Sequence, residues 1–136
     1  MEYKVQRQLT AAIENVPGRL AHISQAISQH DINIEGICVI DNVEQGVIRL
    51  LTSNPAEVKQ LLMAEGVYVI EADVLSVELT DRLGALAKIT ASLAQSQINI
   101  DYLYFTSHHA GALAKIVFKV SDIAGAQRIL GALEVN

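Results

Sequence analysis

The sequence predicts an α+β protein built from two consecutive copies of one strand–helix–strand–strand–helix–strand unit. Segments 17–39 and 83–105 match at a constant offset without a gap. Eight of the 23 aligned pairs are identical, and they include a glycine and an Ile-Asn-Ile tripeptide. Strand-like alternation precedes each matched segment, and helical spacing of apolar residues follows within it. Two unrelated helices would share apolar positions but not the glycine and the tripeptide, so we interpret the chain as an internal duplication.

The first copy opens with a strand and a helix. Apolar and polar residues alternate along 4–13, as expected for a strand with one buried face. The sequence Asn-Val-Pro-Gly at 15–18 breaks this strand. Proline suits the first turn of a helix because its missing N–H would be unpaired there in any case. Residues 19–30 then carry apolar side chains at helical spacing, which predicts a helix.

The remainder of the first copy reads as two strands, a helix and a last strand. A hairpin turn is expected at 42–46, and Ser53-Asn54-Pro55 is typical of a helix start. The predicted elements are strands 33–41 and 47–52, helix 56–65 and strand 68–73. This order is the split βαβ, or ferredoxin-like, arrangement.

The second copy repeats the pattern but stops early. Its predicted elements are strand 75–80, helix 84–97, strands 99–107 and 112–120, and helix 123–133. The chain ends where a fourth strand would begin, so the strand at 75–80 is expected to present an unpaired edge. We place the two domains at 1–73 and 74–136.

Composition narrows the class of protein. The net charge is -5 and the ten Lys and Arg residues are scattered, which argues against a nucleic-acid partner. No apolar run approaches the roughly 20 residues that span a bilayer, so no membrane partner is expected. The single cysteine, Cys38, lies in an apolar run and is expected to be a buried core thiol. One unpaired cysteine and no signal-like segment favour a cytoplasmic protein.

Signals for catalysis and metal binding are weak. No Ser/His/Asp or Cys/His arrangement and no glycine-rich phosphate loop stands out, so we expect no catalytic residues and no cofactor. His108 and His109 are adjacent in a predicted hairpin tip and would point to opposite faces, so we expect an exposed loop and no metal site. Tyr102 and Tyr104 are expected to fill the core on the helix-covered face.

The turn before the first helix carries the most specific motif. Residues 15–20 read Asn-Val-Pro-Gly-Arg-Leu, and Asn33-Ile34 follows fifteen residues after Gly18. This pattern resembles the signature of the ACT domain family over essentially the whole chain. The second copy has Ile98-Asn99-Ile100 but departs at the turn, where Asp81 and Leu83 replace the asparagine and the proline.

The resemblance implies a non-enzymatic regulatory module that binds an amino acid where two ACT domains meet. One domain would offer its first strand–helix turn, and its neighbour would offer the start of its second strand. By position, the candidate ligand-binding residues are Asn15, Gly18, Asn33, Asp81, Gly84 and Asn99.

The chemistry of these residues suits a zwitterion. A helix N-terminus attracts a carboxylate, and an asparagine amide supplies both donors and an acceptor. Glu35 and Asp101, two residues beyond the asparagines, could pair with an ammonium group. Alternatively, the glycines only shape their turns, and the protein is a regulatory or scaffolding subunit that docks on a metabolic enzyme without a ligand.

Two further expectations concern asymmetry and assembly. A carboxylate at Asp81 would repel an anionic ligand, so the turn of the first copy is expected to bind more tightly. The unpaired edge, and strands that are apolar on both faces, predict a homodimer.

Overall fold

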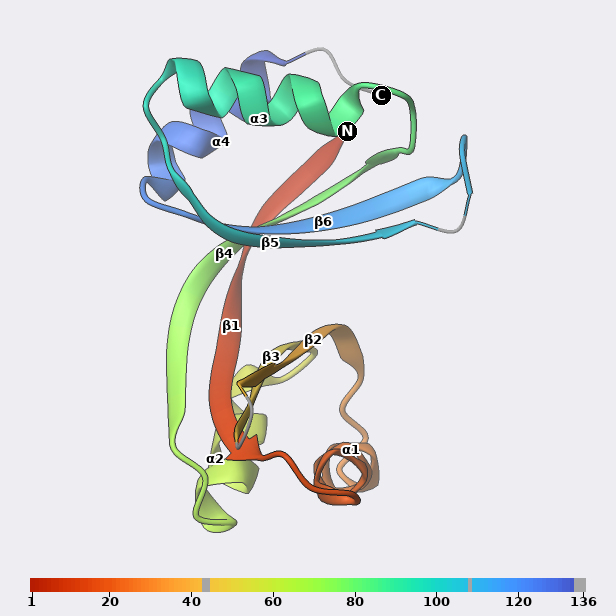
Figure 1. Cartoon of the computed structure of the whole chain (residues 1–136), viewed down its shortest axis with the longest axis vertical. Helices are drawn as coiled ribbons and strands as arrows, with labels where there is room; N and C mark the ends of the chain where they lie inside the picture. The colour runs from red at the N-terminus through yellow and green to blue at the C-terminus, as the bar shows by residue number, and fades with distance from the viewer. Residues whose placement is uncertain (43–44, 108, 134–136) are drawn as a thin grey trace. The chain divides into compact units, whose positions relative to one another are not determined.

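The structure is a computed structural model that describes residues 1–42, 45–107 and 109–133. The predicted hairpin residues 43–44 and His108 therefore lie outside the described residues. Within these residues, six strands and four helices follow one another along the chain (Figure 1). They are β1 (Glu2–Glu14), α1 (Arg19–Gln29), β2 (Ile34–Asn42), β3 (Gln45–Thr52), α2 (Pro55–Ala64), β4 (Val69–Thr80), α3 (Ala85–Gln95), β5 (Ile100–Ser107), β6 (Leu113–Val120) and α4 (Ile123–Ala132).

These elements form two compact units. The first unit is Arg7–Ala72, and the second unit joins Met1–Gln6 to Asp73–Asn136. The long strands β1 and β4 each contribute to both units, and β4 joins the strands predicted at 68–73 and 75–80 into one. Each unit is an α+β, ferredoxin-like layer of four strands and two helices.

In the first unit the strand order is β2-β3-β1-β4. β1 and β3 pair antiparallel, with Leu9 opposite Leu50, and β2 pairs antiparallel with the other side of β3. Helices α1 and α2 bury one apolar stripe each against the same face of this sheet. The core consists of Leu9, Ala11, Ile13, Ile23, Ile27, Ile32, Ile48, Leu50, Val58, Leu62, Val67 and Val69.

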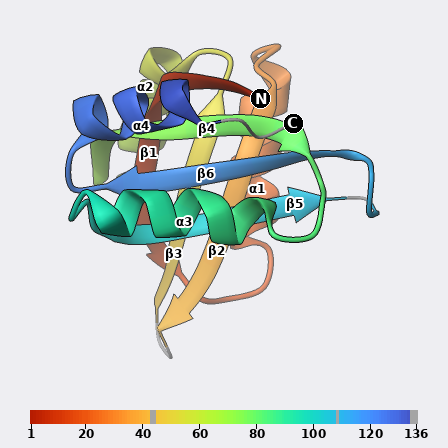
Figure 2. The ribbon, with the colours of Figure 1, turned by 90° about the horizontal axis from the view of Figure 1, so that it is seen from above.

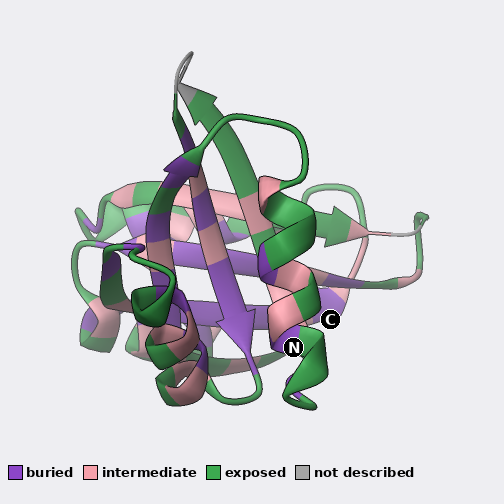
Figure 3. Ribbon diagram, turned by 90° about the horizontal axis from the view of Figure 1, so that it is seen from below, coloured by how far each residue is buried: buried purple, intermediate pink, exposed green. Residues whose placement is uncertain are grey.

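In the second unit the strand order is β1-β4-β6-β5. Figures 1 and 2 show α3 and α4 lying together on one face of the sheet. Ile89 and Leu93 of α3 and Leu130 of α4 are buried against β4 and β6, where Ile116 and Phe118 are fully covered. Figure 3 shows that the strands carry most of the buried residues.

The N-terminal strand corrects one expectation from the sequence. Among the described residues no strand follows α4. The edge at Leu75–Thr80 is nevertheless covered, because β1 lies next to β4. Met1 and Tyr3 pack against the core of the second unit. The expectation of an unpaired edge was therefore wrong: the chain's own N-terminus takes the position of the missing strand.

A β-bulge in each second strand also changes which side chains face the helices. In β5 the register shifts between Ile100 and Tyr102, because a bulge places an extra residue on one strand and resets the alternation beyond it. Leu103 consequently lies opposite the core residue Phe118, and both Ile100 and Leu103 pack against the core. Tyr102 and Tyr104 lie on the face away from the helices, so placing them on the helix-covered face was wrong.

The bulge in β2, between Ile34 and Gly36, has the same effect in the first unit. Ile37 and Val39 pair with the core residues Leu50 and Ile48, and Cys38 falls on the opposite face. Cys38 is only half-buried there. The expectation of a buried core thiol was therefore wrong, because the bulge rotates this residue out of the core.

Candidate ligand-binding turns

A glycine in the left-handed conformation forms the turn before the first helix of each copy. Gly18 has φ +88° and Gly84 has φ +84°, and a Cβ at either would meet nothing within 4 Å. Left-handed backbone strains residues with a Cβ, so glycine is favoured at both positions for the turn itself. The open space beside each glycine additionally leaves the backbone approachable from solvent.

The helices that follow these glycines differ from the other two at their N-termini. Neither α1 nor α3 has a side-chain cap or an acidic residue in its first turn. By contrast, the Asn54 side chain accepts a hydrogen bond from the Glu57 N–H at the start of α2, and Asp122 accepts one from Gly125 at the start of α4. The partial positive charge of a helix N-terminus is thus balanced by the chain's own side chains at α2 and α4 but not at α1 and α3.

The two asparagines of the Ile-Asn-Ile motifs occupy equivalent places. The backbone N–H of Asn33 donates to the Ser53 Oγ at 2.9 Å, and the Ser53 N–H donates to the Asn33 carbonyl at 3.0 Å. Asn99 and Ser121 exchange the same pair of bonds, each at 2.9 Å. These bonds fix the backbone of each asparagine. Both residues are exposed, so their side chains are accessible from solvent.

Around Asn99 the side chains form a small polar network. The Asn99 amide donates to Asp101 Oδ1 at 2.9 Å, and the Lys119 Nζ lies 3.4 Å from Asp101 Oδ2. Lys119 pairs with Tyr102, the first paired residue beyond the bulge in β5. The equivalent residue of the first unit is Leu51, which pairs with Gly36 beyond the bulge in β2. The Asn99 position therefore includes an ion pair between Asp101 and Lys119. Sequence reasoning missed this lysine because it comes from the neighbouring strand.

Asp81 has a structural role that its sequence position did not reveal. Its carboxylate accepts a hydrogen bond from the Ser107 hydroxyl at 2.6 Å. Its backbone N–H donates to the Ala112 carbonyl at 2.7 Å, and its carbonyl accepts from the Gly111 N–H at 2.7 Å. These three bonds fasten the turn before α3 to the hairpin between β5 and β6. Asn15, its counterpart in the first copy, is exposed.

A pocket of about 300 Å³ opens at this second turn. Residues 81–87 line it together with Leu79, Phe105 and Ala110. Pockets of this size hold small organic ligands. The pocket therefore combines an uncapped helix N-terminus, which suits an anionic group, with apolar walls that suit a hydrocarbon side chain.

Within one unit, the turn and the asparagine do not come together. Gly18 precedes α1 and Asn33 follows it, and Gly84 and Asn99 flank α3 in the same way. Each helix has 11 residues, which corresponds to a length of about 16 Å. A ligand that contacted both a turn and an asparagine would need the second group from another domain.

Other candidate sites gain no support. Among the described residues, no group of three or more His, Cys, Asp or Glu side chains is placed to hold a metal ion. No helix in the same part of the chain is long and apolar enough to cross a bilayer.

The chain matches one protein family and is similar in fold to several solved structures. A family model described as an ACT domain pair matches residues 4–133. The solved structure of protein BT0572 from Bacteroides thetaiotaomicron is similar, with 25% identity and a TM-score of 0.89, covering 98% of this chain and 92% of that one. The ligand-free regulatory subunit of aspartate kinase from Thermus thermophilus shares the fold, with 18% identity, a TM-score of 0.68 and 98% coverage of both chains. No curated protein matches the chain.

Proposed function

Since the chain belongs to the family of ACT domain pairs, whose domains are regulatory modules, we propose that it is a non-catalytic regulatory protein that binds an amino acid. The ligand carboxylate would lie at the N-terminus of α1 or α3, against the turn of Gly18 or Gly84. Asn33 or Asn99 of another ACT domain would complete the site, with Asn15 or Asp81 beside the turn.

One observation carries this proposal. Both helices that follow a left-handed glycine lack a cap, whereas Asn54 and Asp122 cap the two remaining helices. A carboxylate at an uncapped N-terminus would accept hydrogen bonds from first-turn N–H groups and offset the helix dipole. The pocket at Asp81–Ala87 supports the same interpretation, because its apolar walls suit the side chain of an amino acid.

The proposal is tested by thermal unfolding of the full chain in the presence of each of the twenty amino acids. A ligand at 100 times its Kd should add about 2.7 kcal/mol to the free energy of unfolding. That increase corresponds to a rise of several degrees in Tm. If no amino acid raises Tm, the proposal fails, and a scaffolding subunit without a ligand becomes the better interpretation.

A matched set of variants locates the site. The double variant Gly18→Asp/Gly84→Asp places a carboxylate where the ligand carboxylate is expected, so the response should be lost. Gly66→Asp is the control, because Gly66 also has a positive φ, of +79°, and open space around it. Both variants carry the same type of backbone strain, about 1–2 kcal/mol per position. A folded double variant that still responds to the amino acid would rule out both turns.

We also propose that the chain forms a homodimer, which would supply the second domain that each site needs. The edge strand β2 leaves Ile37 and Val39 43% and 48% exposed on one face and Ile40 46% exposed on the other, and association at this edge would cover them. Light scattering should give about twice 14.7 kDa. Val39→Lys should weaken the dimer, whereas Val16→Lys, at a 52% exposed position in the turn, should not. A stable monomer at micromolar concentration would contradict this assembly.

A further inference from the structure

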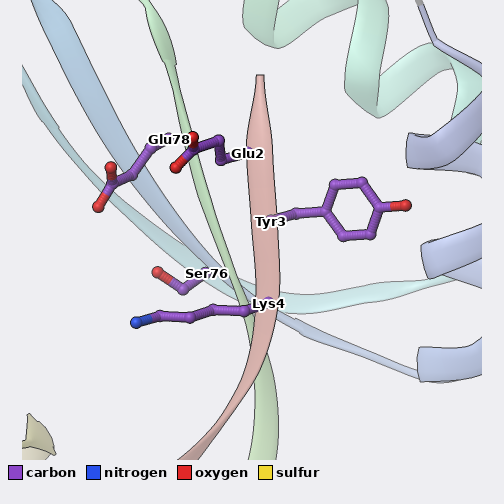
Figure 4. A pocket seen from close by; sticks show the side chains of 5 residues that line it. All are labelled: Glu2, Tyr3, Lys4, Ser76 and Glu78. Carbon is purple, nitrogen blue, oxygen red and sulfur yellow. The ribbon is translucent and has the colours of Figure 1, made fainter.

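A second, polar pocket lies in the second unit and shares no lining residue with the pocket at Asp81–Ala87. It has a volume of about 130 Å³ and is lined by Glu2, Tyr3 and Lys4 of β1 and by Ser76 and Glu78 of β4. Figure 4 shows Tyr3 pointing to one side of the strand and the other four side chains pointing to the other. Because Tyr3 packs against the core beneath the helices, the pocket opens on the opposite face of the sheet.

The charges in this pocket are separated. Figure 4 shows the carboxylates of Glu2 and Glu78 at one end, and the Lys4 ammonium with the Ser76 hydroxyl at the other. None of these four side chains takes part in a hydrogen bond or ion pair within the described part of the chain. Both ends of the pocket therefore retain their full capacity to bind a ligand.

Ser76 is the most informative of the four. The residue is only 3% exposed, yet its hydroxyl is directed into the pocket without a partner among the described residues. The Ser76 Oγ is not among the buried polar atoms that lack a partner, so solvent reaches this oxygen in the pocket and a ligand atom can hydrogen-bond to it. Because the rest of Ser76 is covered, this hydroxyl is held at the base of the pocket, unlike a polar group on an open surface.

We propose that this pocket binds a small zwitterionic amino acid. Its ammonium group would lie between the Glu2 and Glu78 carboxylates, and its carboxylate would accept hydrogen bonds from Lys4 Nζ and the Ser76 hydroxyl. Charge-assisted hydrogen bonds of this kind are stronger than neutral ones. The volume of about 130 Å³ favours the smallest side chains, as in glycine or alanine.

Such a ligand would join two segments far apart in the sequence. Glu2 and Lys4 belong to the N-terminal segment that supplies the missing strand, and Ser76 and Glu78 belong to the strand next to it. The ligand would therefore fasten the N-terminal strand to the second unit. This site is independent of the turns at Gly18 and Gly84, so it can fail without affecting the proposed function.

The test is a titration of the full chain with glycine, followed by calorimetry and by backbone amide NMR. Glycine should bind and shift the amide signals of residues 2–4 and 76–78. Glycine methyl ester, which lacks the carboxylate, and N-acetylglycine, which lacks the ammonium group, should each bind at least about tenfold more weakly. Equal binding of all three compounds would overturn the proposal. So would binding of magnesium chloride without binding of glycine, because the pocket would then be a cation site.

Variants separate this pocket from the turns. Ser76→Ala and Lys4→Met should each weaken glycine binding about tenfold, and Lys4→Met serves if the buried serine proves necessary for folding. Glu78→Gln should also weaken it, with Glu14→Gln, an exposed residue of the first unit, as the matched control. The double variant Gly18→Asp/Gly84→Asp should leave glycine binding here intact. If that variant abolishes it while Ser76→Ala, Lys4→Met and Glu78→Gln do not, the second site is refuted and the turns remain.

Discussion

Tyr3 and Gly131 offer a direct measure of how firmly the N-terminal strand belongs to the second unit. A Cβ at Gly131 of α4 would lie 2.9 Å from the Tyr3 hydroxyl. Replacing a helical glycine by alanine ordinarily stabilises a protein by up to about 1 kcal/mol. Here the added methyl group would displace the tyrosine, at a cost of about 1–3 kcal/mol. Gly131→Ala alone should therefore be neutral or destabilising.

Removal of the Tyr3 hydroxyl should turn the effect of Gly131→Ala from neutral or destabilising to stabilising. In a Tyr3→Phe background the new methyl group has room, so Gly131→Ala should stabilise by up to about 1 kcal/mol. The two substitutions should thus be coupled by about 1–2 kcal/mol in a double-mutant cycle. The free energy of unfolding of the four proteins in urea measures this coupling.

Tyr68→Phe provides the control for the cycle. Tyr68 is 79% exposed, and its substitution should show no coupling to Gly131→Ala. If Gly131→Ala has the same effect in the parent chain and in Tyr3→Phe, Tyr3 does not lie against α4. The assignment of Met1–Gln6 as the closing strand of the second unit would then be incorrect.

Two other substitutions test contacts near the helix starts. Gly125→Ala should lower the free energy of unfolding in urea by about 1–3 kcal/mol, although Gly125 lies in a helix. The added Cβ would collide with the Asp122 carboxylate and lie 3.1 Å from Ile98 Cδ1. A gain in stability would contradict the capping geometry. Asp81→Ala should lower the free energy of unfolding by about 1 kcal/mol, because the hydrogen bond from the Ser107 hydroxyl is lost. Asp81→Asn should lower it less, because the asparagine side chain keeps an oxygen that accepts this bond. Calorimetry should also find tighter amino-acid binding by Asp81→Asn at the second turn, and unchanged affinity would mean that the carboxylate does not repel the ligand.

The sequence was sufficient to predict the duplicated architecture and the start of each helix. The glycine turns, the Ile-Asn-Ile motifs and the helix start at Ser53-Asn54-Pro55 are local signals. Local signals determine turns and caps through bonds between residues close in the chain, such as Asn54 with Glu57. For this reason the predicted elements agree with the observed ones within a few residues.

The closing strand and the bulges could not be predicted in this way. The alternating pattern of β1 shows that the segment is extended, but it does not reveal which sheet the first six residues join. In the second unit this segment packs Met1 and Tyr3 against core residues that are distant in the sequence. Likewise, the bulge beside Tyr102 is fixed by the register with β6. Without that register, simple alternation placed Tyr102 and Tyr104 on the wrong face.

The candidate site was predictable only in part. The repeat and the motif placed Gly18 and Gly84 in the turns before the two helices, whereas their left-handed conformation comes from the structure. The absence of caps on α1 and α3 is a difference that only the structure shows. In α2 and α4 the side-chain oxygens of Asn54 and Asp122 accept hydrogen bonds from N–H groups in the first turn of the helix. The pocket at Asp81–Ala87 depends on Phe105 from another strand, which no local pattern indicates.

The central claim is that an amino-acid carboxylate binds at the uncapped N-termini of α1 and α3. Backbone amide NMR of the ¹⁵N-labelled full chain, titrated with the amino acid that raises Tm most, tests it directly. The largest shifts are expected at residues 18–21 or 84–87, with accompanying shifts at Asn33 or Asn99. Binding that leaves the amides of both first turns unmoved would contradict the claim.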